Sequence, residues 1–548
     1  MALRAFPRRI PGVSRFFADS AAPPDQASPS PASVRDRLVP PFQGSFLWGW
    51  AGPLLVTVFA AVLRLYRLGE PKAVVFDETY YAKDALSLLR YMVERTTLGS
   101  SDDPIADRRL IEGGTDLWVK CAPDNLDPCA LYVAHPPLGK WMIAIGEWIF
   151  GWTPFGWRFA AAMAGTVSVL IIARVARRMT RSTILGCMAG LLLALDGMAF
   201  VLSRTALLDG FLMLWVLAGF ACLVADRDQA RTRLADWYET SALSDTGPRL
   251  GVRWWRIGAG LCLGAACGIK WSGVFFLVAF AVMSVMWDAG ARRAVGLRRP
   301  YRGALGLDVP PAFLAFGVVP AATYVLSWFG WFSSALGWGR NWSEATSAGP
   351  AYFVFSSLRS WFSYHFQVLG YHTGLSSSHA YQSWPWEWPL LARPVAFHYK
   401  SPPCPTGTCS EAVIGVGTPI IWYGAVVALV GLIAWYFSSR DWRAGAVLLA
   451  YAAGWLPWFY YAITDKRTMF AFYTAPMIPF MILAIVLIGG LLIGPAGVAS
   501  NRRAAGAAGV GAFMLLALIN FWWLYPVLSA ETIPYDDWYR RMLFRSWI

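Results

Sequence analysis

Long apolar runs separated by short arginine clusters constrain the fold of this chain more than any other feature of its sequence. Runs of about 20 apolar residues have the length that an α-helix needs to cross a bilayer. With 57% hydrophobic residues, 15% charged residues and a mean hydropathy of +0.44, the composition excludes an ordinary soluble domain. The sequence therefore predicts an all-α polytopic membrane protein with eleven transmembrane helices, near residues 46–65, 157–174, 183–202, 206–225, 256–268, 272–287, 311–330, 418–438, 444–462, 474–494 and 505–525.

The arginine clusters orient these helices, because cytoplasmic loops carry an excess of Lys and Arg. If the N-terminus is inside, the loops with the clusters all fall in the cytoplasm. This topology explains the net charge of +14, so the basic composition does not indicate nucleic-acid binding. Two features fit less well: the basic tail that contains Arg540, Arg541 and Arg545 falls outside, and only Lys270 interrupts the run from 256 to 287. The cytoplasmic clusters lie within 174–181, 227–256, 292–302, 440–443 and 502–503.

The same topology divides the chain into segments. The first 45 residues are rich in Pro, Ser and Ala, which predicts a disordered cytoplasmic tail. No small-residue cleavage site follows the first apolar run, so we expect a retained span and no removable signal peptide. The predicted segments are the tail (1–45), an N-terminal transmembrane half (46–330) with a first external loop (66–156), a second external loop (331–417), C-terminal helices (418–528) and a C-terminal tail (529–548).

The histidines and four of the cysteines agree with this division. All five histidines lie in the two external loops, and so do two close cysteine pairs. Pairs at this spacing on the oxidising side of a membrane predict disulfides, with free thiols as the alternative. Zinc binding is less favoured, because no two ligands have the usual finger spacing. The predicted bridges join Cys121 to Cys129 and Cys404 to Cys409.

The segment VVFDETYYAKDA, residues 74–85, places two adjacent carboxylates, Asp77 and Glu78, just beyond the first apolar run. Charges at the edge of a membrane span are costly and mark functional sites, so this acidic pair is the first candidate for catalysis. The alternative is that both carboxylates cap a helix that begins at Thr79, because Asp and Glu are favoured at helix N-termini. The segment alone leaves both interpretations open.

Further charged residues lie near the predicted outer ends of the spans. Cations and carboxylates at one depth suit a substrate with a phosphate at the membrane surface and a lipid tail below it, because Arg and Lys both bind phosphate. For a single cation, extension of the side chain to the interface is the simpler explanation, but the concentration at one end of the bundle favours a site. These residues are Arg64, His135, Lys140, Arg158, Arg204, Asp209 and Lys270, with Asp465, Lys466 and Arg467 in the sequence TDKRTMF.

Several motifs, taken in order, resemble those of the protein O-mannosyltransferases. The resemblance covers residues 46–495 and is strongest to the actinobacterial enzymes that use polyprenyl-phosphate-mannose. It implies a GT-C-type bundle with two large extracytoplasmic loops. The loop 331–417 is too short for the β-trefoil domain of eukaryotic members, which leaves the acceptor less defined than the chemistry. The motifs are RLYRL, VVFDETYYAKDA, HPPLGKW, SRTALLDGFLMLW, GIKWSGVFF and HAYQSWPWEWPL.

The resemblance implies transfer of mannose from polyprenyl-phosphate-mannose to Ser or Thr hydroxyls of proteins that emerge from the secretion translocon, at the outer face of the plasma membrane. An in-line displacement would invert the β-linked donor. A hydroxyl nucleophile needs a base, and the departing phosphate needs cations. We expect Asp77 to be the base and Glu78 to orient it, although the two are interchangeable at this stage. The predicted phosphate ligands, with Arg158 the first choice, are Arg64, Arg158, Arg204 and Lys270, and no metal or other cofactor is expected to be required.

Aromatic residues give a weaker signal. Most of the 30 tryptophans are expected at the membrane interfaces, but Trp384, Trp386 and Trp388 are candidates for contact with the sugar or the acceptor. One alternative function is a related transferase with another lipid-linked sugar or a glycolipid acceptor. A more remote one is a transporter, which the concentration of charges at one end of the spans disfavours, as does the lack of an apparent inverted repeat.

Overall fold

The structure is a computed structural model that describes residues 34–548 except 41, 43–44, 100–102, 122–128, 241–243, 343–349, 406 and 496–498. Most of the predicted disordered tail therefore lies outside the described residues. Its last part is helical, because Val34–Leu38 forms α1. Arg35 pairs with Glu239 at 2.8 Å, and Leu38 is buried against the end of α9 (Leu208–Thr240). The predicted boundary of the tail at residue 45 stays a prediction.

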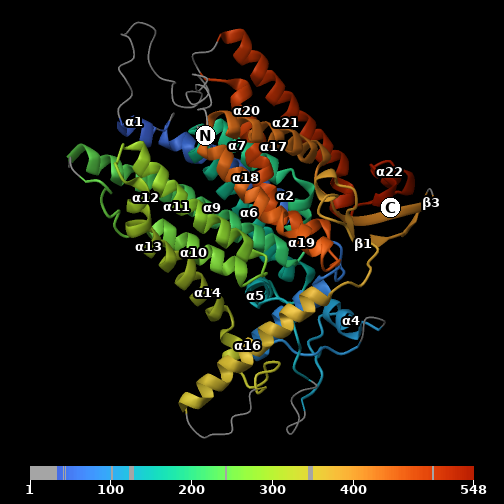
Figure 1. Cartoon of the computed structure of the whole chain (residues 1–548). Coiled ribbons are helices and arrows are strands. Elements are labelled where there is room, and N and C mark those ends of the chain that lie inside the picture. The colour runs from blue at the N-terminus through green and yellow to red at the C-terminus, as the bar shows by residue number, and fades with distance from the viewer. Residues whose placement is uncertain are drawn as a thin grey trace.

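In the described part of the chain, nine helices are long and apolar enough to cross a membrane. They coincide with nine of the eleven predicted runs. They are distributed along the chain from its N-terminal to its C-terminal part (Figure 1). They are α2 (Phe46–Leu65), α6 (Pro154–Thr180), α9 (Leu208–Thr240), α11 (Gly273–Ala294), Pro300–Ser327, α17 (Pro419–Ser439), Trp442–Ile463, which joins α18 (Trp442–Trp455) to α19 (Pro457–Ile463), Ala471–Ile493, which joins η6 (Ala471–Met477) to α20 (Ile478–Ile493), and α21 (Ser500–Leu528).

The other two predicted runs form shorter helices. The run at 183–202 is α7 (Thr183–Ala194) and α8 (Gly197–Leu202), which are separated by Leu195 and Asp196. Asp196 caps α8 by accepting from the Ala199 N–H at 2.9 Å. The run at 256–268 is α10 (Trp254–Cys267), which has 14 residues. Since a span needs about 20 residues, the count of eleven spans stays a prediction.

The segment Pro300–Ser327 is irregular throughout. Two π-helical turns interrupt it, and α10 packs against its last part. Proline removes a backbone donor from a helix, and wide π-helical turns accommodate such defects; this segment contains Pro310, Pro311 and Pro320. Its pieces are α12 (Pro300–Gly303), η3 (Ala304–Asp308), α13 (Val309–Phe313), η4 (Leu314–Val318) and α14 (Val319–Ser327).

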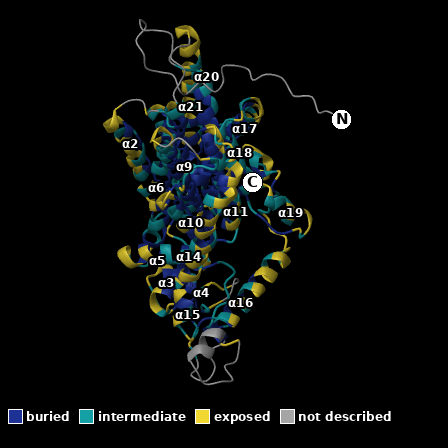
Figure 2. Ribbon diagram, turned by 60° about the vertical axis from the view of Figure 1, so that its left-hand side comes forward, coloured by how far each residue is buried: buried dark blue, intermediate teal, exposed yellow. Residues whose placement is uncertain are grey.

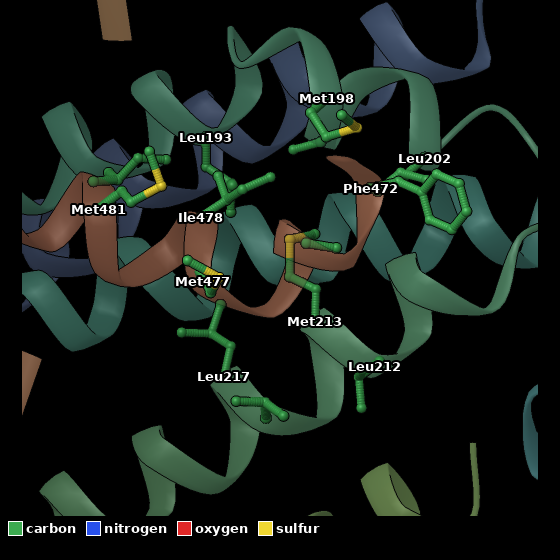
Figure 3. Packing of buried hydrophobic residues seen from close by; sticks show 14 of the residues in the cluster. Leu193, Met198, Leu202, Leu212, Met213, Leu217, Phe472, Met477, Ile478 and Met481 are labelled. Carbon is green, nitrogen blue, oxygen red and sulfur yellow. The ribbon is translucent and has the colours of Figure 1, made fainter. Parts of the chain in front are cut away.

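The centre of the bundle lies between α7, α8, α9, η6 and α20. Figure 3 shows Leu193, Met198, Leu217, Met477 and Ile478 from these elements packed against one another. Buried residues concentrate along this central region, whereas α2 and α16 are partly exposed (Figure 2). Apolar side chains packed inside the bundle hold α9 and α20 in place, and α9 begins beside the charged residues described below.

The first external loop contains α3 (Glu78–Tyr91), α4 (Ile105–Ile111) and α5 (Leu138–Phe150). The α5 helix packs against both α3 and α6, which fixes α3 over the outer end of the bundle. The structure joins Cys121 to Cys129, as expected from the sequence. In Figure 1, α4, α5 and α16 lie at the end of the bundle opposite α1 and α12.

The second external loop contains most of α15 (Phe329–Ser333), α16 (Pro350–Gly374) and three strands of a small sheet that the all-α prediction did not anticipate. A disulfide joins Cys404 to Cys409. The antiparallel order is β1-β3-β2, and β4 pairs with β3. The strands are β1 (Val395–Lys400), β2 (Pro403–Cys404), β3 (Gly407–Gly415) and β4 (Thr532–Pro534).

The segment after α21 lies beside this second loop. Besides the pairing of β4 with β3, Trp547 Nε1 donates to the Leu391 carbonyl at 2.7 Å. The short helix α22 (Tyr535–Tyr539) also contacts β3. The basic tail 529–548 is therefore on the side of the second external loop, where the span count placed it despite its charge.

Candidate active site

A cavity of about 520 Å³ lies at the end of the bundle that carries α16, between α11, α14, α16, α19 and η6. Part of its lining is polar, with His135, Asp209, Lys270, His372 and Arg467. The remainder is largely apolar and comes mainly from helices that face the membrane. It includes Leu212, Val274, Phe275, Leu277, Gly317, Pro320 and Ala321. A cavity with these two kinds of lining suits an amphipathic ligand with a charged head and a lipid tail.

Lys270 and Asp209 form the central ion pair of the cavity. Lys270 Nζ lies 2.7 Å from Asp209 Oδ2, and both side chains are almost completely buried. Lys270 occupies the short connection between α10 and α11, and Asp209 lies in the first turn of α9. The lysine nitrogen also lies 5.3 Å from the centre of the Tyr473 ring. Both residues were predicted from the sequence, and the structure brings them together.

Asp77 lies beside this pair. Burial raises the pKa of the Asp77 carboxyl to about 6, Lys270 opposes this increase and Asp209 adds to it. Although Asp77 precedes α3, its side chain makes no capping hydrogen bond. The Asp77 side chain is half-buried, so protein atoms surround most of it and part of it remains accessible to solvent. The capping interpretation therefore fails for Asp77, whose carboxylate is available at neutral pH to accept a proton.

The backbone before Asp77 is held in an unusual conformation. Phe76 has a φ of 48°, in the left-handed region that bulky residues rarely adopt. Such conformations cost about 1–3 kcal/mol and persist only where surrounding contacts impose them. Here the Phe76 ring stacks on Phe397 with centroids 5.0 Å apart and meets Phe472 edge-on at 5.8 Å. Phe397 sits where the register of β1 and β3 shifts, which re-aims its side chain.

Glu78 has a different environment from its neighbour. It is fully buried, and its two oxygens accept four hydrogen bonds. Oε1 accepts from Arg158 Nε at 2.8 Å and from the Ala206 N–H at 3.0 Å. Oε2 accepts from Arg158 Nη2 and from the Val75 N–H, both at 2.9 Å. Glu78 therefore fixes the start of α3 and has no free lone pair that favours a role as base.

Arg158 uses all its donors within the protein. In addition to Glu78, it donates to the carbonyls of Leu68, Pro71 and Ala73 at 3.4, 3.0 and 2.8 Å. A guanidinium has five N–H donors, and these five bonds account for them. The predicted role of Arg158 as first phosphate ligand does not fit this geometry. Its observed role is to hold the loop 68–73 against α6.

Two other predicted phosphate ligands also bind protein carbonyls. Arg204 donates to the carbonyls of Arg64 and Tyr66 at 2.8 and 2.6 Å and to that of Arg67 at 3.0 Å. These bonds satisfy carbonyls at the end of α2. Arg64 is fully buried inside the bundle and donates to the Leu193 carbonyl at 3.2 Å. Neither arginine is among the residues that line the cavity.

Lys140 and Trp388 are buried away from the cavity, whereas Trp386 is exposed. Lys140 is buried between Glu94 and Asp84, 3.5 Å from an Asp84 oxygen, and does not line the cavity. Trp388 is only 1% exposed, and its Nε1 donates to Ser383 Oγ at 3.0 Å, so it is a core residue. Trp384 and Trp386 stack at 5.5 Å, and Trp386 is 46% exposed. Of the three, Trp386 presents the largest surface to an acceptor.

His135 lies in the cavity as predicted. Its ring is 5.4 Å from that of His372, and its Nδ1 is buried without a hydrogen-bond partner among the described residues. Burial lowers the pKa of His135 well below its ordinary value, and Lys270 adds to the effect. The imidazole is therefore neutral and can hydrogen-bond a sugar hydroxyl or a phosphate oxygen.

The sequence analysis missed several contributors to this region. Phe76 lies inside the recognised acidic motif, but nothing in the sequence reports its backbone conformation. His372 was recorded only as one of five external histidines, although it bonds to Arg467 at 3.1 Å. Tyr324 Oη accepts from Trp271 Nε1 at 2.9 Å and bonds to His365 Nε2 at 2.7 Å at the cavity wall. These aromatic and polar residues form no periodic pattern in the sequence that would have identified them.

The expectation that no metal is required stays a prediction. Across the residues that the structure describes, no group of three or more His, Cys, Asp or Glu side chains is arranged to hold a metal ion. The cations nearest the acidic pair are protein side chains, Arg158 beside Glu78 and Lys270 beside Asp77.

Comparisons with known proteins agree on one family. A family model described as dolichyl-phosphate-mannose-protein mannosyltransferase matches residues 54–299, and a model of the C-terminal four-helix region of protein O-mannosyltransferase matches residues 357–547. The chain is 40% identical to the polyprenol-phosphate-mannose–protein mannosyltransferase of Mycolicibacterium smegmatis strain MKD8, covering 91% of this chain and 93% of the relative. It is 33% identical to the protein of the same name in Corynebacterium glutamicum, covering 93% and 96%.

A solved structure gives the same result for the fold. The yeast (S. cerevisiae) protein O-mannosyltransferase Pmt1-Pmt2 complex bound to its sugar donor matches with a TM-score of 0.66 at 14% identity, over 92% of this chain and 93% of that chain. At this identity the similarity concerns the fold alone. It supports the GT-C-type bundle that the sequence motifs implied.

Proposed function

This chain belongs to the family of dolichyl-phosphate-mannose-protein mannosyltransferases, and on that premise we propose that it transfers mannose from polyprenyl-phosphate-mannose to Ser or Thr hydroxyls of proteins. It is a multi-pass membrane glycosyltransferase, and lipid-linked mannose is its donor. The observation that carries the mechanism is Asp77, a half-buried and uncapped carboxylate beside a cavity with a charged part and an apolar part.

In the proposed reaction the acceptor hydroxyl attacks C1 of the mannose. The new C1–O bond forms as the bond from C1 to the phosphate oxygen breaks, and the hydroxyl proton moves to Asp77. Polyprenyl phosphate leaves with one more negative charge than it had in the donor. A single displacement of this kind inverts the configuration at C1. Asp77 supplies the base that a hydroxyl nucleophile needs.

The donor is proposed to occupy the cavity with its phosphate near Lys270. The lysine keeps two N–H donors after its bond to Asp209. The apolar lining from α11 and α14 then receives the first part of the prenyl chain, and His135 bonds the sugar or the phosphate. Fixed cations near the departing oxygen stabilise the charge that develops on the phosphate. Of the four predicted phosphate ligands, Lys270 is the one that lies next to the phosphate in this placement.

The active site is proposed to face the outside of the plasma membrane. The arginine-rich loops support this orientation, because they lie at the other end of the spans from Asp77. The two disulfides also support it, since such bonds persist in oxidising compartments. The proposed acceptors are secreted or membrane proteins as they emerge from the translocon, with Trp386 at the exposed surface.

The proposal is tested with the purified protein, radiolabelled polyprenyl-phosphate-mannose and a Thr-rich peptide. The wild type should transfer label to the peptide, and Lys270→Met should raise the donor KM by about tenfold or more, because a bond to a charged group contributes about 1.5–3 kcal/mol. Lys72→Met removes an exposed lysine from the loop before Asp77 and should leave the donor KM unchanged. An unaltered donor KM in folded Lys270→Met would remove Lys270 from the phosphate site.

Transfer should also depend on pH. A general base acts only when it is deprotonated, and burial raises the pKa of Asp77 to about 6. Turnover at saturating donor should therefore fall about tenfold for each pH unit below 6 and level off above about 7. A pH profile of kcat, measured with the protein's folding checked at each pH, tests this expectation. A flat profile between pH 5 and pH 8 contradicts the assignment of Asp77 as base.

A further inference from the structure

We infer that Arg467 binds the phosphate of the lipid donor and of the departing polyprenyl phosphate, and that His372 positions it. The inference rests on the proposed function, because it names a further ligand of the same cavity. Arg467 lies in the connection between α19 and η6, and His372 lies in the last turn of α16. Both residues line the cavity together with Lys270.

Arg467 has unused donors and lines the cavity, whereas Arg64 and Arg204, which also have unused donors, do not line it. Its Nη1 donates to the His372 carbonyl and its Nη2 to His372 Nδ1 at 3.1 Å. Since a guanidinium has five donors, three N–H groups remain, and one of them, at Nε, is buried with no partner among the described residues. Arg158, by contrast, uses all five of its donors.

No acidic partner balances the charge of Arg467 among the described residues. Within the described part of the chain it has no carboxylate within 4 Å, whereas Lys270 is paired with Asp209 at 2.7 Å. The side chain is only 7% exposed, so the charge is poorly solvated. A cation that is buried without an acidic partner is costly unless a ligand supplies the negative charge. A phosphate in the cavity supplies that charge and accepts the free N–H groups.

His372 is fixed on two sides. Its Nε2 bonds to the Ala134 carbonyl at 3.0 Å, and its Nδ1 faces Arg467 Nη2. A carbonyl only accepts and a guanidinium only donates, so Nε2 carries the proton and Nδ1 is the acceptor. Burial lowers the pKa of His372 to about 4, and Arg467 adds to the effect. The neutral ring thus orients Arg467 without competing for the phosphate.

The test separates the phosphate from the lipid tail. Binding of undecaprenyl phosphate and of uncharged undecaprenol to the purified full-length protein is measured in detergent. Arg467→Ala should weaken binding of undecaprenyl phosphate about tenfold and leave undecaprenol binding unchanged. Lys466, although also a candidate from the sequence, is exposed and does not line the cavity, so Lys466→Ala should bind both as the wild type does. Equal affinities of wild type and Arg467→Ala for undecaprenyl phosphate would overturn the role of Arg467.

Two matched variants test the positioning role of His372. The Asn oxygen occupies the place of His Nδ1, so His372→Asn keeps the acceptor for Arg467. The Gln amide occupies the place of Nε2, so His372→Gln keeps only the bond to Ala134. We expect His372→Gln to weaken binding of undecaprenyl phosphate about tenfold. His372→Asn should bind undecaprenyl phosphate within about twofold of the wild-type affinity. In a protein that already carries Arg467→Ala, His372→Gln should have no further effect.

The outcomes distinguish this inference from the proposed function. Equal loss in His372→Asn and His372→Gln, or additive loss with Arg467→Ala, would show that His372 does not act through Arg467. The affinities do not depend on mannosyl transfer. Absence of transfer by the wild type would therefore overturn the proposed function while leaving the measured phosphate site intact.

Discussion

Asp77→Asn should lower the turnover of mannosyl transfer by about 100-fold or more, because it removes the proton acceptor and general base catalysis contributes about 10²–10⁴-fold. The substitution keeps the size of the side chain, and Asp77 makes no capping bond that it would break. Affinity for the lipid donor should therefore remain close to that of the wild type. Single-turnover measurements with radiolabelled donor and Thr-rich peptide give the rate of the chemical step.

The control for this variant is Asp116→Asn, which makes the same chemical change in the same external loop. The Asp116 side chain is 80% exposed and its nearest cation, Arg109, is 3.4 Å away. This variant should retain full turnover. Near-normal turnover of Asp77→Asn, with thermal unfolding equal to that of the wild type, would contradict a base at this position and leave the acidic motif with a structural role.

Arg158→Ala should lower the free energy of unfolding by about 3–5 kcal/mol, because it leaves Glu78 as an unpaired buried carboxylate. It also leaves the carbonyls of Pro71 and Ala73 without a donor. Thermal unfolding in detergent should show a large decrease in the midpoint temperature. The fraction that remains folded should bind undecaprenyl phosphate with nearly the affinity of the wild type, because Arg158 has no N–H free for a ligand.

An exposed ion pair provides the comparison for Arg158. Arg108 lies 2.7 Å from Asp103, with both side chains more than half exposed, and Arg108→Ala should change the stability by no more than about 1 kcal/mol. A stable Arg158→Ala protein with weakened phosphate binding would restore the role that the sequence alone predicted for this residue. Glu78→Gln should behave like a milder Arg158→Ala and lose stability more than turnover.

The bundle could be predicted because the length of an apolar run largely decides where a membrane helix lies. The predicted run at 505–525, for example, lies within α21, and the run at 272–287 lies within α11. The prediction is less complete where a local feature competes with hydropathy. In the run at 183–202, the sequence Asp196-Gly197 contains a helix-capping residue, and the helix breaks there. That signal was present and was outweighed by the apolar residues around it.

The candidate site could be located from the sequence but not resolved into roles. Asp77, Asp209 and Lys270 were chosen by charge and by position near span ends, and these properties are visible in the sequence. Whether an arginine is free for a ligand depends on nearby backbone carbonyls, which every residue possesses. Arg158 and Arg467 therefore look equivalent in the sequence, although one is saturated by the loop 68–73 and the other is not.

The pairing of β4 with β3 bears on how the enzyme is made. This pairing supports the sheet whose strand β1 presents Phe397 to Phe76, next to Asp77, the proposed base. Ribosomes add about 5–20 residues per second, so β4 is synthesised about 20–90 s after Asp77. It reaches the sheet only after α21 has been inserted into the membrane. The sheet beside Asp77 is therefore complete only after the rest of the membrane bundle has been synthesised.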